Sequence, residues 1–224
     1  MAKPMHPLTP KLVAEFIGTF ALVFVGVLVL HHGAAAGLVG IALAHGLTIA
    51  VMASALMLIS GAHFNPAVTF GLLVGKRISF GDAVAYVLVQ LLAATAAAFL
   101  AVRAVPGMDL AMGTPSVAMG LSTGQAIVIE AVLTFFLALV VYGTGVDARF
   151  GGRIGGLAIG LTVTLDILAG GPLTGAAMNP ARWFGPAAAA MNWTGAFVYI
   201  VGPLAGGAIA GWVYTTFLAQ KPSA

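Results

Sequence analysis

Long apolar stretches recur along the chain at lengths that suit membrane-spanning helices. A helix needs about 17 to 25 mostly apolar residues to cross a bilayer. Six runs reach that length, and they cover residues 12–30, 38–57, 82–103, 124–145, 154–170 and 194–219. The first run is longer than the core of a signal peptide, so we expect it to be retained as a span. The pattern predicts an all-α membrane protein with six transmembrane helices.

Two further apolar runs, 65–75 and 179–189, are too short to cross, and both begin with Asn-Pro-Ala. Short hydrophobic segments at matching places in two halves are typical of re-entrant half-helices that line a pathway. Residues 60–71 align with residues 174–185 without a gap, and seven of the twelve positions are identical. Glu15 recurs as Glu130 in a similar context.

A duplicated chain with three spans in each half must insert its halves in opposite directions, because three is an odd number. We therefore expect inverted repeats at about 11–103 and 124–219, within a single channel domain covering residues 1–224. The two short segments should enter from opposite faces and meet near the midplane, where irregular backbone survives only beside a polar cavity or inside protein.

The Asn-Pro-Ala motifs have the chemistry of helix starts facing a pore. Asparagine is a favoured N-cap, and proline suits the first helical position. We expect both asparagines to keep their NH2 donors directed at the pore, beside two half-helix N-termini that each carry about half a positive charge. A passing water would then accept from the protein and not from its neighbour. The motif residues are Asn65, Pro66, Ala67, Asn179, Pro180 and Ala181.

The loops before the two motifs should supply acceptors. Their backbone carbonyls would form a ladder that holds permeating water, while the helix dipoles repel cations. The predicted carbonyl residues are Ala62, His63, Phe64, Gly175, Ala177 and Met178.

These features resemble the aquaporins of the major intrinsic protein family over essentially the whole chain. The matching segments are Ala14-Glu15-Phe16, His45-Gly46-Leu47-Thr48, Ser60 to Gly71, and Gly175 to Ala187. The resemblance implies the aquaporin fold, with six spans and two re-entrant half-helices. It also implies a passive water channel with a pore in each subunit of a homotetramer.

The resemblance also implies individual roles. Glu15 and Glu130 would brace the irregular loops, although a transport role is the alternative. The selectivity filter would comprise His45, Ile167, Ala176 and Arg182, a set similar to that of plant tonoplast intrinsic proteins.

Ala176 and Ile167 make this filter wider and less polar than a strictly water-selective one. We therefore expect ammonia to pass, with urea and hydrogen peroxide as further candidates, while protons and ions are excluded. Trp183 and Ile200 depart from the usual water-channel residues at their positions.

Other polar residues have less definite roles. His63 is expected to pack in its loop, with pH sensing as the alternative. His31 and His32 are expected in the first external loop, where no further metal ligands stand nearby. Asp166 is expected near the outer end of its span, facing an external vestibule or a neighbouring subunit.

Composition agrees with a membrane protein. Hydrophobic residues make up 61% of the chain and charged ones 7%, whereas a soluble domain carries roughly 25% charged residues. There is no cysteine, and no nucleophile–base pair, metal constellation or cofactor motif is visible. We expect no enzyme activity, no metal, no cofactor and no nucleic-acid partner, but rather water, small neutral solutes and the lipid bilayer.

The cations indicate orientation. With six spans, the segments that carry most of them fall on one side of the membrane, so the positive-inside rule places both termini in the cytoplasm. The membrane would be the inner membrane of a prokaryote or the vacuole of a plant. The residues concerned are Lys3, Lys11, Lys76, Arg77, Arg149, Arg153 and Lys221.

Three other functions remain open at this point: an ion-coupled secondary transporter with inverted repeats, a glycerol-type facilitator and a closed-pore structural membrane protein. Ion coupling needs titratable groups in the pathway, and only Arg182 and His45 qualify. Glycerol facilitators usually carry an aspartate after the arginine, where this chain has Trp183.

Overall fold

The computed structural model describes residues 7–147 and 154–219, and every regular element within those ranges is a helix. The fold-class prediction is therefore confirmed. Four of the cations on which the orientation prediction rests, Lys3, Arg149, Arg153 and Lys221, lie outside the described residues.

Six helices are long and apolar enough to cross a membrane. They are α1 (Leu8–His31), α2 (Gly33–Ser60), α4 (Phe80–Ala104), α6 (Thr123–Val141), α7 (Gly155–Thr174) and α9 (Ala196–Val213). The helices α6 and α9 each continue into a short π-helical turn, η1 (Tyr142–Val146) and η3 (Tyr214–Leu218). A four-residue helix, α5 (Leu110–Gly113), lies in the connection between the two halves.

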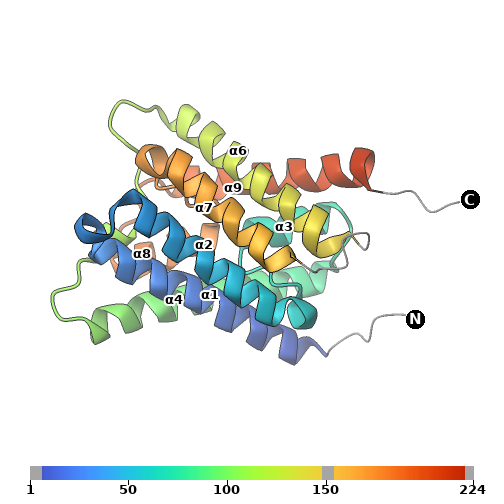
Figure 1. The fold of residues 1–224 in the computed structure, drawn as a ribbon, viewed down its shortest axis with the longest axis horizontal. Helices are drawn as coiled ribbons and strands as arrows, with labels where there is room; N and C mark the ends of the chain where they lie inside the picture. Colours follow the sequence, from blue (N-terminus) through green and yellow to red (C-terminus); the bar gives the residue numbers. More distant parts are fainter. Residues whose placement is uncertain (1–6, 148–153, 220–224) are drawn as a thin grey trace, which may run out of the picture.

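Two half-helices lie between the spans, as the sequence predicted. They are α3 (Pro66–Val74) and α8 (Pro180–Ala189). Figure 1 shows them near opposite ends of the molecule, while the start of α1 and the end of α9 with η3 lie at the same end. This arrangement agrees with two halves that enter the bilayer in opposite directions.

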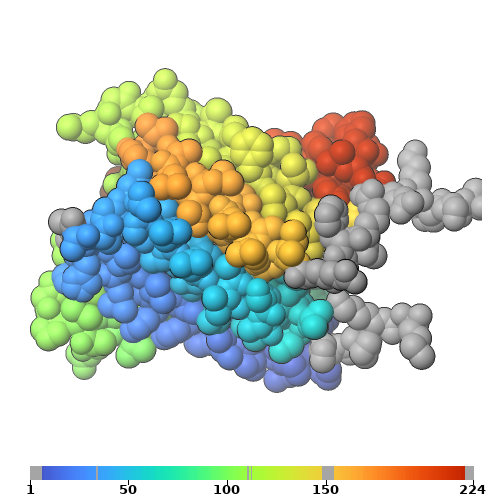
Figure 2. Space-filling model, in the orientation of Figure 1, coloured from blue at the N-terminus to red at the C-terminus, as the bar shows by residue number. Residues whose placement is uncertain are grey.

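The closest crossing of the two halves is between α2 and α7. A Cβ atom added at Gly46 would meet the side chain of Thr164 and the carbonyl of Gly160, and one at Gly160 would meet the carbonyl of Gly46. Small residues let membrane helices approach backbone to backbone. Figure 2 shows α2 and α7 side by side on one face of the molecule.

The outer surface of the spans is apolar. Large hydrophobic side chains on α2, α4 and α9 are more than half exposed, among them Leu58, Leu88 and Trp212. Such a surface fits lipid and not water. The chain is an integral, multi-pass membrane protein.

The connection between α1 and α2 differs from the prediction. We expected His31 and His32 in an external loop, but His31 ends α1 and α2 begins at Gly33. The chain reverses in a tight turn there, because helix continues closer to both histidines than the apolar run suggested.

Candidate pore and selectivity filter

The two loops before the half-helices have the same unusual backbone. The helices α2 and α7 end at Gly61 and Gly175, with φ of 92° and 76°. Left-handed φ also occurs at non-glycine residues in matched places, Ala62 and Ala176, and then Phe64 and Met178. Each such residue costs free energy, so the surrounding contacts must hold the loops in place.

Glu15 holds the first loop. Its carboxylate accepts from the hydroxyl of Ser60 (2.7 Å) and from the backbone N–H groups of His63 (2.9 Å) and Phe64 (2.7 Å). It also accepts from the side-chain amide of Gln90 on α4 at 2.8 Å. Glu15 is fully buried. A carboxylate that accepts four hydrogen bonds is satisfied without a cation.

Glu130 holds the second loop in the same way. It accepts from the hydroxyl of Thr174 (2.7 Å) and from the N–H groups of Ala177 (3.0 Å) and Met178 (2.7 Å). Both oxygens therefore face donors, and the side chain has no exposed surface. This geometry suits a brace and leaves no oxygen for a passing ion.

Two tyrosines that the sequence reasoning missed complete the frame. The hydroxyl of Tyr86 donates to the carbonyl of Ser60, and that of Tyr199 donates to the carbonyl of Thr174, both at 2.8 Å. Both tyrosines are buried, on α4 and α9 respectively. Their near-repeat spacing from the motifs was the available signal. Gln90 was also missed, and it has no counterpart among the donors to Glu130.

The asparagines join the two half-helices at the centre. Each caps its own helix: Oδ1 of Asn65 accepts from Ala67 N at 2.8 Å, and Oδ1 of Asn179 accepts from Ala181 N at 2.9 Å. Nδ2 of each also crosses to the other half. Asn65 donates to the carbonyl of Met178 (2.8 Å), and Asn179 donates to that of Phe64 (2.9 Å).

These crossing bonds correct one expectation. The NH2 groups are not wholly directed at the pore, because one N–H of each is used across the repeat. An amide NH2 has two donors, so one N–H on Asn65 and one on Asn179 remain for a solute. The carbonyls of Phe64 and Met178, expected as pore acceptors, each already accept one of these bonds but retain a second lone pair.

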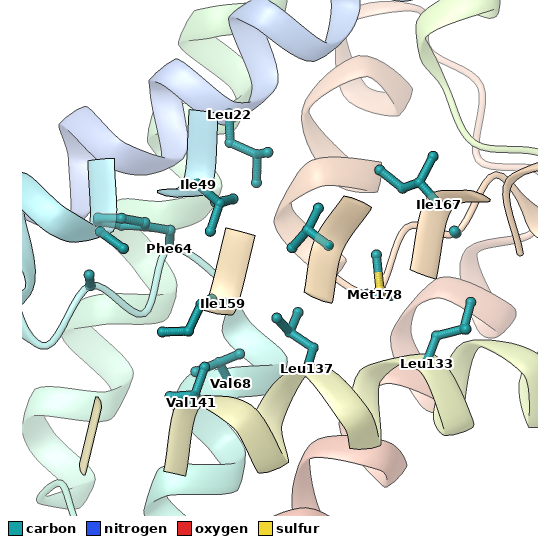
Figure 3. Close-up of a cluster of buried hydrophobic side chains, with 14 of the residues drawn as sticks. Leu22, Ile49, Phe64, Val68, Leu133, Leu137, Val141, Ile159, Ile167 and Met178 are labelled. Carbon is teal, nitrogen blue, oxygen red and sulfur yellow. The ribbon is translucent and has the colours of Figure 1, made fainter. Parts of the chain in front are cut away.

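A narrow cavity runs past the motifs. It is lined by both asparagines, by Arg182 and His45, and by apolar side chains from several spans. Its volume is about 30 Å³, which holds only a few waters, since one water needs about 10–15 Å³. Figure 3 shows its apolar wall, in which Leu22, Ile49 and Leu137 come from different helices.

The polar side of the cavity follows the loops. Ala62, His63, Phe64, Ala177 and Met178 line it, as expected for the carbonyl ladder, whereas Gly175 does not.

His63 also packs outside the pore. Its ring lies edge-on to Tyr86, and its Nδ1 is 3.0 Å from the hydroxyl of Thr69.

The four filter positions lie together at one end. His45 (α2), Ile167 (α7), Ala176 and Arg182 are all buried and all line the cavity. Nη2 of Arg182 lies 3.3 Å from Nε2 of His45, and Nδ1 of His45 lies 2.8 Å from the carbonyl of Ile41. Guanidinium only donates and a carbonyl only accepts. The imidazole is therefore neutral, with its proton on Nδ1.

This pairing leaves one donor for solutes. Nη1 of Arg182 is buried and has no hydrogen-bond partner among the described residues. Nε2 of His45 is already engaged by the guanidinium, so the acceptor expected there for ammonia is shared. Arg182 is the donor that the filter presents, opposite the apolar side chains of Ile167 and Ala176.

Asp166 contradicts its prediction. It does not face a vestibule or another subunit: it is fully buried, and neither carboxylate oxygen has a partner among the described residues. Gly170, one turn further along α7, contacts Leu133 of α6, so Asp166 faces α6 as well. Glu130 is near enough to act on it electrostatically. The buried α6–α7 contact, not the outer end of the span, sets its surroundings.

Six spans, two half-helices meeting N-terminus to N-terminus and a water-sized pore between them define a membrane channel. A model of the family described as major intrinsic protein matches residues 5–214. The chain belongs to this family.

Curated relatives are plant proteins. The chain is 48% identical to "Aquaporin TIP2-1" of Arabidopsis thaliana, over 90% of this chain and 84% of that one. It is 42% identical to "Probable aquaporin TIP3-2" of Oryza sativa subsp. japonica, over 99% and 88%. With "Aquaporin TIP1-2" of Zea mays the identity is 45%, over 97% and 90%. These relatives are channel proteins, which is consistent with a chain that is not an enzyme.

A solved structure has the same fold. It is described as "X-ray structure of the aquaglyceroporin from Plasmodium falciparum", with a TM-score of 0.81 and 24% sequence identity. The superposition covers 95% of this chain and 97% of that one.

Proposed function

We propose that each chain is a passive, bidirectional water channel, one transmembrane unit whose two halves share a pore. The observation that carries the proposal is the meeting of Asn65 and Asn179 in a cavity with room for a few waters. Family membership supports the same function. Osmotic shrinkage of proteoliposomes tests it, because a channel adds water flux that bare lipid lacks.

Protons and cations are excluded at two places. At the centre, the remaining N–H of each asparagine and two half-helix N-termini orient the central water so that it cannot relay a proton. At the filter, the buried guanidinium of Arg182 repels cations. It is held in position by His45 at 3.3 Å.

Ammonia passes the filter as the neutral molecule. It accepts from Nη1 of Arg182, while Ile167 and Ala176 lower the desolvation cost for a solute that binds water less strongly than water does. Urea and hydrogen peroxide are further candidates, because Ala176 leaves more room than a threonine would. Ammonium is rejected with other cations.

The alternatives are weaker. A secondary transporter needs groups that bind the coupling ion, and the titratable side chains that line the described cavity are His45, His63 and Arg182. All three sites are buried beside donors or aromatic rings, and none offers an anionic ligand. Flux that rises linearly with concentration supports a channel, whereas saturation would support a transporter.

A glycerol-type facilitator and a closed structural protein are separated by solute. Glycerol entry into proteoliposomes would favour the first, and an absence of any permeability would favour the second.

The assembly and orientation extend the same proposal. We propose a homotetramer with both termini in the cytoplasm and, by likeness to the tonoplast relatives, a vacuole-type membrane in a plant host or the inner membrane in a prokaryote. Mass measurement in detergent and protease access to sealed vesicles test these two points.

A further inference from the structure

A second hollow lies outside the pore, between α4 and α9, and we call it the α4–α9 groove. Its volume is about 500 Å³, and it shares no lining residue with the pore. Its floor is formed by the backs of the two half-helices: Pro66 and Thr69 of α3, and Pro180 and Trp183 of α8. All four are buried.

The rim of the groove is exposed and apolar. Phe80 and Leu88 of α4 are 72% and 63% exposed, and Ile200 of α9 is 42% exposed. Thr69 is the only polar side chain that lines the groove. Its hydroxyl is occupied, because it donates to the carbonyl of Asn65 (3.0 Å) and accepts from Gln90 (3.1 Å). The groove therefore offers no hydrogen bond to water.

The position of the groove places it within the hydrocarbon core. Its two walls are membrane-spanning helices, and its floor contains the prolines at which the half-helices begin. At one end Phe184 lines the groove and packs against Trp193, with ring centroids 5.6 Å apart. Trp193 is 46% exposed in the α8–α9 connection, and tryptophan is enriched where a membrane protein meets the headgroups.

The volume decides between a lipid tail and another helix. A volume of about 500 Å³ corresponds to roughly one turn of a helix about 10 Å in diameter. That is too little for a spanning helix of a second copy, whereas a flexible hydrocarbon chain can thread it. An empty apolar hollow would forfeit dispersion contacts along its whole lining.

We propose that the α4–α9 groove binds an acyl chain of a bilayer phospholipid. The chain packs against the backs of α3 and α8, the half-helices whose opposite side presents Asn65, Asn179 and Arg182 to the pore. The site is separate from the permeation pathway and does not depend on which solutes the pore passes.

Bromine-labelled lipid tests the proposal, because bromine on an acyl chain quenches tryptophan fluorescence at short range. The chain has three tryptophans, so Trp193→Phe with Trp212→Phe leaves Trp183, in the groove floor, as the single reporter. This variant is reconstituted in phosphatidylcholine brominated either near the methyl end or near the ester. We expect a loss of Trp183 fluorescence that is larger for bromine near the methyl end, because Trp183 lies one turn from the half-helix start.

Filling the groove should remove that loss. Val87→Phe on α4 and Ile200→Phe on α9 each add bulk from one wall, and both residues line the groove. Leu92→Phe is the matched control, since Leu92 is 62% exposed on α4 and does not line it. We expect weaker quenching in both filled variants and unchanged quenching in the control.

Water permeability of each variant, equal to that of the parent, shows that the fold is intact. If either filled variant loses flux, the other decides, because they act from opposite walls. The proposal is overturned if Trp183 is not quenched in the parent background, or if quenching is equal in filled and control variants. It is also overturned if cross-links from Ile200 show that a second copy covers the groove.

Discussion

Arg182 donates to His45 across the narrow end of the pore, with Nη2 and Nε2 3.3 Å apart. The opposite ring nitrogen of His45 is held by the carbonyl of Ile41. A side chain of the first half thus fixes the one charged side chain that lines the pore and comes from the second half. Charge exclusion depends on this pair and not on the arginine alone.

Removing the pair should open the ion barrier. We expect Arg182→Val combined with His45→Ala to conduct protons or cations above the lipid leak, because the guanidinium charge and its support are both lost. A pH-sensitive dye inside proteoliposomes measures this, with water flux as the control for folding. An ion barrier that survives in a water-conducting double variant would show that Arg182 does not guard the pore.

Filter shape should control ammonia more than water. In Ile167→His with Ala176→Thr, the apolar wall becomes polar and narrower. A barrier higher by about 1 kcal/mol would slow ammonia roughly fivefold, and water should change less. Alkalinisation of the vesicle interior after an ammonia gradient gives the rate. If wild-type vesicles conduct water but pass ammonia only at the lipid background, the ammonia proposal is wrong.

Two buried carboxyls on neighbouring helices should respond oppositely to amidation. In Glu130→Gln an NH2 replaces an acceptor that faces N–H or O–H donors, at a cost of about 1–3 kcal/mol. Asp166→Asn breaks no hydrogen bond to a described residue, so little change is expected. Thermal unfolding in detergent compares them. Equal losses of stability would mean that Glu130 does not brace its loop.

The α2–α7 crossing should not tolerate side chains. Gly160→Val would drive a methyl group into the carbonyl of Gly46, and we expect a loss of about 1–3 kcal/mol or more. Leu157→Val, at an exposed position on the same helix, is the control. Size-exclusion profiles and thermal unfolding report the difference. A stable, water-conducting Gly160→Val protein would contradict the close approach.

Much of the fold could be predicted because its causes are local in sequence. Span length follows from apolar runs, and the half-helices follow from Asn-Pro-Ala before a run too short to cross. The duplication then fixed how the halves enter the membrane. Glu15 and Glu130 could be singled out because a carboxyl within a span is costly unless it has partners.

What could not be predicted depends on side-chain partners from distant helices. No local pattern shows that Tyr199 reaches the carbonyl of Thr174, or that Asn65 spends one N–H on Met178. Asp166 was misplaced because its position along the span is visible in the sequence, whereas the helix face on which it lies depends on how α6 packs on α7.

The most direct test of the account is stopped-flow light scattering of proteoliposomes in an osmotic gradient. The account predicts that vesicles containing the protein shrink faster than empty ones, with a low activation energy, because water moves through a preformed file past Asn65 and Asn179. Shrinkage at the rate of bare lipid, in several lipid compositions and at several pH values, would contradict it.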